Sequence, residues 1–376
     1  MRKKTALIHG GITTDAQTGA VSLPIFQAST FKQKSVGDFT YEYGRTGNPT
    51  REGVESFIAT IEQGTHGFAF ASGMAAIHAV MQLFEAGDHL LITDDVYGGT
   101  YRLMTKILAK NNISVSFVDT ADHAAIEAAI TPATKAIFIE TPTNPLLKVT
   151  DIRAVAQLAQ QHNLTLIVDN TFSTPYWQNP LVLGADIVVH SATKYLGGHS
   201  DVVAGLVAVK DEQLAEQLHF IQNGAGAVLS PHDSWLLIRG MKTLGVRMEE
   251  IEHNANKLAA FLVAHPKVEK VYYPGLSSHK GHTIHEAQAS GFGGIISFTV
   301  ATEQQALAVL QRTKFFTLAE SLGAVESLIS LPAKMTHASI PHERRLALGI
   351  EDGLIRISVG LEDIEDLIED LTQALQ

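Results

Sequence analysis

Short apolar runs alternate with amphipathic stretches through the middle of the chain. The runs are rich in β-branched residues, which is typical of buried strands, and they cover 66–70, 89–93, 113–118, 135–139, 164–168, 186–189 and 205–209. Most of the gaps carry apolar residues at the three- to four-residue spacing of a helix. Strands that alternate with helices predict an α/β fold with a large, mostly parallel sheet covered on both faces.

The two ends of the chain depart from this alternation. Residues 1–50 show no clear periodicity, so we expect an arm that covers a site or lies across another subunit. A helix from Arg51 to about Gln63 follows. Beyond Gly224 the pattern changes to helices, with a boundary near Leu244, and then to a mixture of strands and helices. We predict an arm at 1–45, a large-sheet domain at 46–244 and a smaller C-terminal α+β domain at 245–376.

Composition limits the classes of function. The chain has 376 residues, a formal net charge of −11 and no cysteine. The acidic charge without basic runs disfavours nucleic acid and anionic membranes as partners. The lack of cysteine excludes disulfides, thiolate metal sites and cysteine nucleophiles. The apolar stretch after the basic start is too short for a signal peptide, and no run approaches a membrane span, so we expect a cytoplasmic protein.

Polar clusters follow five of the predicted strands. Ligands of parallel sheets gather beyond the carboxyl ends of the strands, so these clusters predict a binding site. The clusters are Ser72-Gly73-Met74, Asp94-Asp95-Val96-Tyr97, Glu140-Thr141-Pro142-Thr143-Asn144-Pro145, Asp169-Asn170-Thr171 and Ser191-Ala192-Thr193-Lys194.

The last of these clusters suggests a cofactor. Ser191 and Thr193 place two hydroxyls beside Lys194, and two glycines follow at 197–198. Hydroxyls and backbone amides at a strand end suit a phosphate, and a lysine against apolar walls becomes a nucleophile toward carbonyls. Phosphate binding together with a Schiff-base lysine is what pyridoxal 5′-phosphate (PLP) requires. Taken alone, the stretch is equally consistent with a polar loop that carries a solvated lysine.

Other residues can supply the remaining parts of a PLP site. Asp169 at a strand end can face the pyridine nitrogen, or it can cap the next segment. The turn at Gly73 can direct backbone amides at a phosphate, or it can be an ordinary capped turn. Tyr97 can stack on the cofactor ring, or it can be an ordinary packing residue. Arg356 can bind a substrate carboxylate, or form a structural ion pair. Three histidines at 279–285 allow a metal site, but a solvated loop is the expectation because no carboxylate or thiol completes the set.

Taken together, these motifs resemble the Cys/Met-metabolism family of PLP enzymes over essentially the whole chain. The lysine stretch at 186–200 carries the resemblance most specifically. It is joined by motifs at 43–50, 71–74, 95–100, 140–145, 168–171, 319–323, 332–337 and 355–362. The resemblance implies the aspartate-aminotransferase-like fold (PLP fold type I), in agreement with the alternation of strands and helices. It also implies that 46–244 is the PLP-binding domain.

The resemblance assigns expected roles to individual residues. Lys194 would attach PLP and act as a catalytic base, and Tyr97 would stack on the ring and take part in catalysis. The cofactor contacts implied are Tyr43, Arg45, Gly73, Met74, Tyr97, Asp169, Thr171, Ser191, Thr193 and Lys194. Tyr43 and Arg45 would reach the phosphate of the neighbouring subunit, which implies an active dimer within a homotetramer. The substrate contacts implied are Asn144, Glu320, Ser321, Arg356 and Arg102, and no metal is expected.

The reaction is expected from one acidic position. Glu320 matches a carboxylate that is typical of cystathionine γ-synthases and γ-lyases, and it can hold the distal ammonium of cystathionine. The absence of cysteine disfavours a methionine γ-lyase. The resemblance therefore implies cystathionine γ-lyase activity on a small sulfur amino acid, with β-elimination and hydrogen sulfide release in the same pocket. The alternatives are cystathionine γ-synthase, then cystathionine β-lyase, and outside this group an aminotransferase or a non-catalytic regulatory protein of the same fold.

Overall fold

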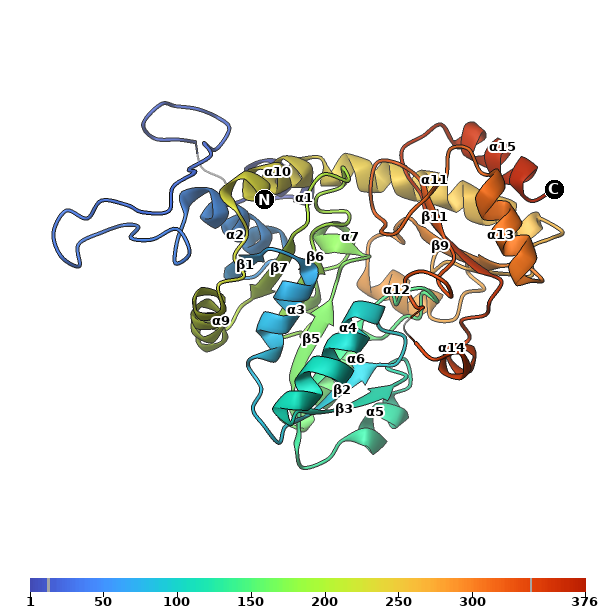
Figure 1. Cartoon of the computed structure of the whole chain (residues 1–376), viewed down its shortest axis with the longest axis horizontal. Helices are drawn as coiled ribbons and strands as arrows, with labels where there is room; N and C mark the ends of the chain where they lie inside the picture. The colour runs from blue at the N-terminus through green and yellow to red at the C-terminus, as the bar shows by residue number, and fades with distance from the viewer. Residues whose placement is uncertain (12–13, 339) are drawn as a thin grey trace.

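The computed structural model describes residues 1–11, 14–338 and 340–376. Within these residues the chain builds two sheets, a larger one from its first two thirds and a smaller one from its last third (Figure 1). The large sheet has seven strands in the order β1-β7-β6-β5-β4-β2-β3. The strands are β1 (His66–Phe70), β2 (His89–Thr93), β3 (Ser114–Val118), β4 (Thr134–Glu140), β5 (Thr165–Asp169), β6 (Ile187–Ser191) and β7 (Gly205–Val209).

The pairing of the large sheet confirms the prediction of a mostly parallel sheet. β2, β3, β4, β5 and β6 pair in parallel, whereas β7 runs antiparallel to both β6 and β1. Parallel strands need helical crossovers, which cover the faces of the sheet. The helices of this part are α2 (Pro49–Ile61), α3 (Gly73–Met81), α4 (Gly98–Arg102), α5 (His123–Ala129), α6 (Ile152–Gln161), α7 (Thr174–Trp177), α8 (Pro180–Leu183), α9 (Glu212–Ala225) and α10 (Pro231–Lys242). α4 continues through π-helical 103–107 and a 3₁₀ turn at 108–111.

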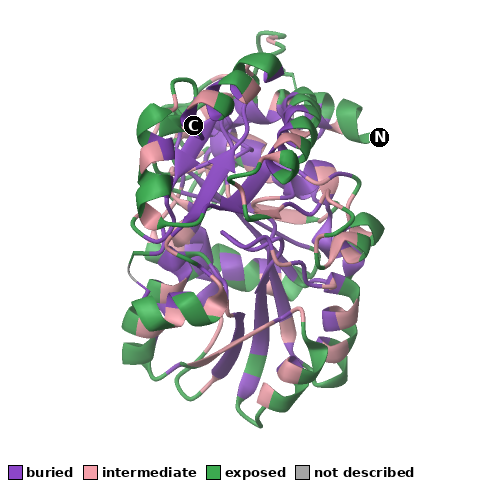
Figure 2. Cartoon of the chain, turned by 90° about the vertical axis from the view of Figure 1, so that its right-hand side faces the viewer, coloured by how far each residue is buried: buried purple, intermediate pink, exposed green. Residues whose placement is uncertain are grey.

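Side-chain caps explain why several of these helices begin where they do. The Ser72 hydroxyl accepts a hydrogen bond from the backbone N–H of Ala75 at the start of α3. The carboxylates of Asp151 and Asp211 cap α6 and α9 in the same way. Apolar faces of the helices then close over strands whose residues are largely buried (Figure 2). The strand ends therefore stay at a fixed edge of a packed sheet.

The last third of the chain forms the smaller α+β part. Its sheet has five strands in the order β10-β11-β12-β9-β8 within the described residues. Its elements are α11 (Leu244–Ala264), β8 (Lys270–Tyr272), α12 (His282–Gln288), β9 (Ile295–Thr299), α13 (Glu303–Arg312), β10 (Thr317–Leu318), β11 (Leu328–Ser330), α14 (His342–Leu348), β12 (Leu354–Ser358) and α15 (Ile364–Ala374). A separate apolar cluster fills the space between this sheet and its helices. In the described chain, none of the helices combines the length and apolar character that crossing a bilayer needs.

The first residues do not belong to a free arm. They form α1 (Lys3–His9), which buries Leu7 and donates a hydrogen bond from Lys3 Nζ to the carbonyl of Tyr176 at 2.8 Å. The described residues between α1 and α2 project away from the body as long loops (Figure 1), and an antiparallel bridge joins Thr30 to Tyr43. The domain limits at 45 and 244 stay a prediction, although α11 begins at Leu244, where a boundary was expected.

The expectation of a solvated loop at 279–285 is wrong. His282 begins α12, and His285 is buried. His282 Nδ1 lies 2.7 Å from the carbonyl oxygen of Pro274, and His285 Nε2 lies 2.9 Å from that of Gly291. These histidines are therefore packing residues that join α12 to its neighbouring loops, an arrangement that the spacing of polar residues does not reveal.

Candidate active site

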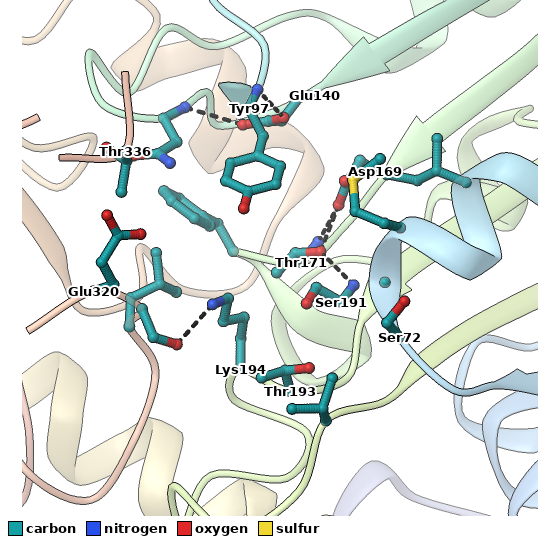
Figure 3. A pocket seen from close by; sticks show the side chains of 18 of the residues that line it. Ser72, Tyr97, Glu140, Asp169, Thr171, Ser191, Thr193, Lys194, Glu320 and Thr336 are labelled. Carbon is teal, nitrogen blue, oxygen red and sulfur yellow. Dashed lines mark hydrogen bonds between the residues drawn. The ribbon is translucent and has the colours of Figure 1, made fainter. Parts of the chain in front are cut away.

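One cavity of about 220 Å³ opens where the carboxyl ends of the large sheet face the smaller domain (Figure 3). Strands and turns of the large sheet supply one side of it, and residues near 320, 336 and 356 supply the other. The lining residues are Ser72, Gly73, Met74, Ile77, Tyr97, Glu140, Asn144, Asp169, Thr171, Phe172, Ser191, Thr193, Lys194, Val203, Glu320, Ser321, Leu322, Thr336 and Arg356.

The cavity brings together most of the residues predicted from the sequence. All of them line it except Tyr43, Arg45 and Arg102. Tyr43 is exposed on the arm, and Arg45 Nη1 donates a hydrogen bond to Asn223 Oδ1 at 2.8 Å. Arg102 is the last residue of α4. The roles expected for these three residues stay predictions.

Lys194 is the nucleophile candidate, and burial sets its reactivity. Its side chain projects into the cavity, and its Nζ donates a hydrogen bond to Ser321 Oγ at 2.6 Å (Figure 3). Burial lowers the pKa of Lys194 to about 8, and the nearby Arg356 adds to that effect, while Glu320 opposes it. The share of neutral amine near neutral pH is therefore far larger than for a free lysine, and attack on a carbonyl requires that neutral form.

Arg356 forms an anion site from the central strand β12 of the small sheet. It is completely buried, and it donates to Asn144 Oδ1 at 2.9 Å and to the carbonyl oxygen of Ser321 at 2.7 Å. Among the residues that the structure describes, its Nε has no hydrogen-bond partner. None of these oxygens belongs to a carboxylate, so the guanidinium meets only neutral acceptors there. A carboxylate ligand would supply the opposite charge that this buried cation needs.

Ser321 lies between Lys194 and Arg356 and has an unusual backbone conformation. Its φ of 90° lies in the left-handed region that disfavours residues with a Cβ. Its hydroxyl accepts from Lys194 and its carbonyl accepts from Arg356. Such conformations persist where surrounding contacts fix them, and they cluster at functional sites.

Asp169 closes β5 at the opposite side of the cavity. Both the backbone N–H and the hydroxyl of Thr171 donate to its Oδ1, at 3.0 and 2.5 Å. The Thr171 hydroxyl in turn accepts from the backbone N–H of Ser191 at 2.9 Å, which ties β5 to β6. Burial raises the pKa of Asp169, and the hydrogen bonds from Thr171 oppose that rise. A cationic N–H placed against Oδ2, which Thr171 leaves without a hydrogen bond, would favour the ionised carboxylate.

The N-terminus of α3 forms a close-packed turn beside Ser191. A Cβ at Gly73 would lie 2.8 Å from the Cβ of Ser191, so only glycine lets the helix start approach β6 this closely. Free N–H groups and the positive end of the helix dipole suit an anion at this point. The Ser72 hydroxyl is already used as the helix cap, so backbone amides are the groups available here.

Comparisons with known proteins give the family. The family model described as "Cys/Met metabolism PLP-dependent enzyme" matches residues 4–376. The chain belongs to this family. It is 62% identical to a cystathionine gamma-lyase of Bacillus subtilis, with both chains covered in full. It is 57% identical to a cystathionine beta-lyase of Lactococcus lactis subsp. cremoris, over 99% of this chain and 98% of the other.

A solved structure agrees with the sequence relatives. The crystal structure of a cystathionine gamma-lyase from Lactobacillus plantarum complexed with L-serine superposes with a TM-score of 0.98 at 54% identity, covering 100% of this chain and 98% of that one. The chain is therefore a PLP-dependent enzyme of sulfur amino-acid metabolism with the type I fold. The relatives differ in their reaction, so they give the family without deciding between γ- and β-elimination.

The cavity of this PLP-dependent enzyme fits its cofactor. The tight turn at Gly73 brings the start of α3 against Ser191. A phosphate there would meet backbone amides together with the hydroxyls of Ser191 and Thr193, which line the same cavity. Lys194, Asp169 and Tyr97 line the same cavity. When PLP is bound, Lys194 would bind the aldehyde carbon, Asp169 would hold the pyridine nitrogen and Tyr97 would stack on the ring. A substrate carboxylate would meet Arg356, whose Nε has no partner among the described residues.

Sequence reasoning missed several lining residues of this enzyme. Ile77, Phe172 and Val203 add an apolar wall that no motif spacing separates from ordinary core positions. Leu322 and Thr336 lie in the motifs at 319–323 and 332–337, but those motifs assigned them no role. Glu140 is the more informative omission. It ends β4 beside Asp169, so its place among the polar strand ends was a signal for it.

Proposed function

We propose that this enzyme is a cystathionine γ-lyase, which converts L-cystathionine and water to L-cysteine, 2-oxobutanoate and ammonia. The observation that carries the proposal is Glu320. It lines the cavity beside Ser321, and its side chain projects inward on the side away from Asp169 (Figure 3). A carboxylate there offers the distal ammonium of cystathionine a partner, while Arg356 binds the carboxylate at the reacting end.

In the proposed reaction, different residues of the chain carry out different steps. Arg356 and Asn144 hold the α-carboxylate of the substrate and thereby orient its Cα–H bond toward Lys194. Bound PLP supplies an electron sink for the carbanion at Cα. Lys194 accepts the Cα proton and then labilises the protons on Cβ, after which the bond between Cγ and sulfur breaks and cysteine takes a proton. Ser321 holds the Lys194 amine between these positions through its hydroxyl.

Two related reactions use the same residues. A γ-synthase would let a thiol add at Cγ in place of the elimination, and a β-lyase would break the bond between Cβ and sulfur. β-Elimination is favoured by one observation, the 57% identity to a cystathionine beta-lyase over nearly the whole chain. We propose γ-elimination as the main activity because Glu320 offers a charge partner at the distal end of the substrate.

The test is product analysis of the PLP-loaded enzyme with L-cystathionine. We expect 2-oxobutanoate and cysteine in equal amounts, without an added keto-acid acceptor. Pyruvate with homocysteine would instead establish β-elimination and refute the proposal. Cystathionine formation from cysteine and an O-acylated homoserine, with no elimination, would make the enzyme a γ-synthase. A requirement for a keto-acid acceptor would support an aminotransferase.

The arm carries a second part of the proposal. Tyr43 and Arg45 lie outside the cavity of their own chain, and the segment before them projects from the body. We propose that they contact the PLP phosphate bound by a second copy of the chain, so that the active unit is a dimer within a homotetramer. The exposed tyrosine and the guanidinium, which lies 5.6 Å from its ring centroid, suit an anion on another subunit.

A further inference from the structure

Two buried carboxylates, Glu140 in the cavity wall and Asp95 outside the lining, join two loops of the cavity. Glu140 is the last residue of β4, and Asp95 follows β2. One loop, residues 94–97, carries Tyr97. The other loop, residues 140–146, carries Asn144. Neither carboxylate has a role in the reaction steps described above.

Glu140 binds the backbone of both loops at once. Its Oε2 accepts from the backbone N–H of Tyr97 at 3.0 Å, and its Oε1 accepts from the backbone N–H of Asn144 at 3.1 Å (Figure 3). Each of the two carboxyl oxygens meets its own N–H donor, an arrangement that the ionised carboxylate satisfies best. Burial and the neighbouring Asp169 raise the pKa of Glu140, and these two N–H groups oppose the rise.

Asp95 makes the reciprocal connection. It stands on the loop of Tyr97, and its Oδ2 accepts from the Thr143 hydroxyl at 2.6 Å and from the backbone N–H of Leu146 at 3.3 Å. These two partners flank Asn144 on the opposite loop. Each carboxylate therefore reaches from its own loop to the other, and both are buried.

We propose that Glu140 is a positioning residue of this enzyme, which fixes the Tyr97 ring and the Asn144 amide relative to Asp169, and that Asp95 holds the same two loops from the other side. The inference rests on the proposed function, because it takes Tyr97 as the contact for the PLP ring and Asn144 as a contact for the substrate carboxylate. Small errors in such placements reduce rates strongly, and buried hydrogen bonds to the supporting backbone prevent them.

The position of Glu140 separates a geometric role from an electrostatic one. Glu140 and Asp169 are direct partners in the pairing of β4 with β5. Removing the negative charge of Glu140 favours the ionised form of Asp169, which strengthens its contact with a pyridinium. A charge effect alone therefore predicts tighter PLP binding in Glu140→Gln. The positioning role predicts the opposite change, because the Gln amide NH₂ would face one of the two N–H donors.

The experiment compares Glu140→Gln with Asp370→Asn in the PLP-loaded enzyme. Asp370 is a matched control: it is a buried carboxylate in α15 that accepts from the backbone N–H groups of Lys314, Phe315 and Phe316, and it does not line the cavity. The readouts are visible circular dichroism of bound PLP, PLP affinity, and spectral titration with glycine, an amino acid with no leaving group. We expect Glu140→Gln to alter the dichroism and to weaken both PLP and glycine about tenfold. Both variants lower the unfolding temperature, and Asp370→Asn leaves the three site readouts unchanged.

Unchanged dichroism and glycine affinity in Glu140→Gln, or tighter PLP binding, would overturn the proposal. If Glu140→Gln does not fold, Thr143→Val tests the same arrangement from the side of Asp95, since it removes the hydroxyl and keeps the shape. We expect it to weaken glycine a few-fold, and wild-type affinity would refute the inference. These readouts need no turnover, so a wild-type enzyme that gives pyruvate contradicts the proposed function and leaves this test intact.

Discussion

Burial, more than any neighbouring charge, lowers the pKa of the Lys194 amine. Desolvation makes the ammonium unfavourable and lowers its pKa to about 8, from 10.5 for a free lysine. Between these two values the folded protein holds a neutral amine where an exposed lysine is still charged. The single hydrogen bond to Ser321 orients that amine without neutralising it.

This pKa shift predicts how the enzyme takes up its cofactor. We expect the rate at which the PLP-free protein captures PLP to rise as the pH increases through about 8, because the neutral amine attacks the aldehyde. Stopped-flow absorbance across a pH series measures that rate. A rate that keeps rising toward 10.5 would show an unshifted lysine, and Lys194→Ala serves as the blank for non-specific lysines.

Glu320 supports a prediction about substrate length. Glu320→Gln should raise KM for L-cystathionine about tenfold, the effect of losing one charge-assisted hydrogen bond. KM for L-cysteine should stay unchanged, because cysteine has no distal ammonium. Steady-state kinetics of the one variant with both substrates measures the difference. An equal rise in both KM values would show that Glu320 acts on the cavity in general.

At the level of elements, the sequence predicted the sheet better than it predicted the contacts between loops. The runs at 66–70, 89–93 and 205–209 coincide with β1, β2 and β7, since buried strands leave a local pattern of apolar residues. α3 begins at Gly73, in a turn that the sequence left as either a phosphate site or an ordinary helix cap. The role of Glu140 could not be predicted, because its two partners come from different loops that meet only in the fold.

The start of α3 supports a prediction about packing. Gly73→Ala places a Cβ 2.8 Å from the Ser191 Cβ, so α3 and β6 must separate. We expect PLP affinity to fall about tenfold or more, because the phosphate would lose its close approach to the backbone amides. Equilibrium titration of PLP measures the affinity, and thermal unfolding of the PLP-free variant measures the cost of packing alone. Unchanged PLP affinity would place the phosphate elsewhere.

At the level of the whole molecule, the described residues of the projecting arm do not contribute to the cavity of their own chain. Local sequence patterns showed that residues 1–50 lack a core of their own, yet α1 docks on the body through Leu7 and Lys3. A contact between the arm and another subunit depends on the surfaces of two copies of the chain. A local sequence pattern does not reveal such a contact. The contact of Tyr43 and Arg45 with the PLP phosphate of a neighbouring subunit therefore stays a prediction.

Mixing two defective variants tests that assembly. Lys194→Ala removes the amine, and Arg45→Ala should weaken PLP retention in the neighbouring site. Mixed dimers contain one site with both residues intact, so refolding equal amounts together should restore about a quarter of the wild-type activity. Keto-acid release by the mixture, against each variant alone, gives the measure. No gain on mixing would refute a site shared between subunits.

The pairing of β1 with the distant strand β7 affects the chain while it is being translated. In the described part of the chain, β7 is the strand that pairs with β1 along its length, and His66 faces Val209 in that pairing. A ribosome adds about 5–20 residues per second, so roughly 7–30 s pass between the synthesis of these partners. During that interval β1 emerges with both of its edges open, while β2 can already pair with β3 next in sequence. The 66–70 segment therefore stays open to edge-to-edge association until its distant partner has been translated.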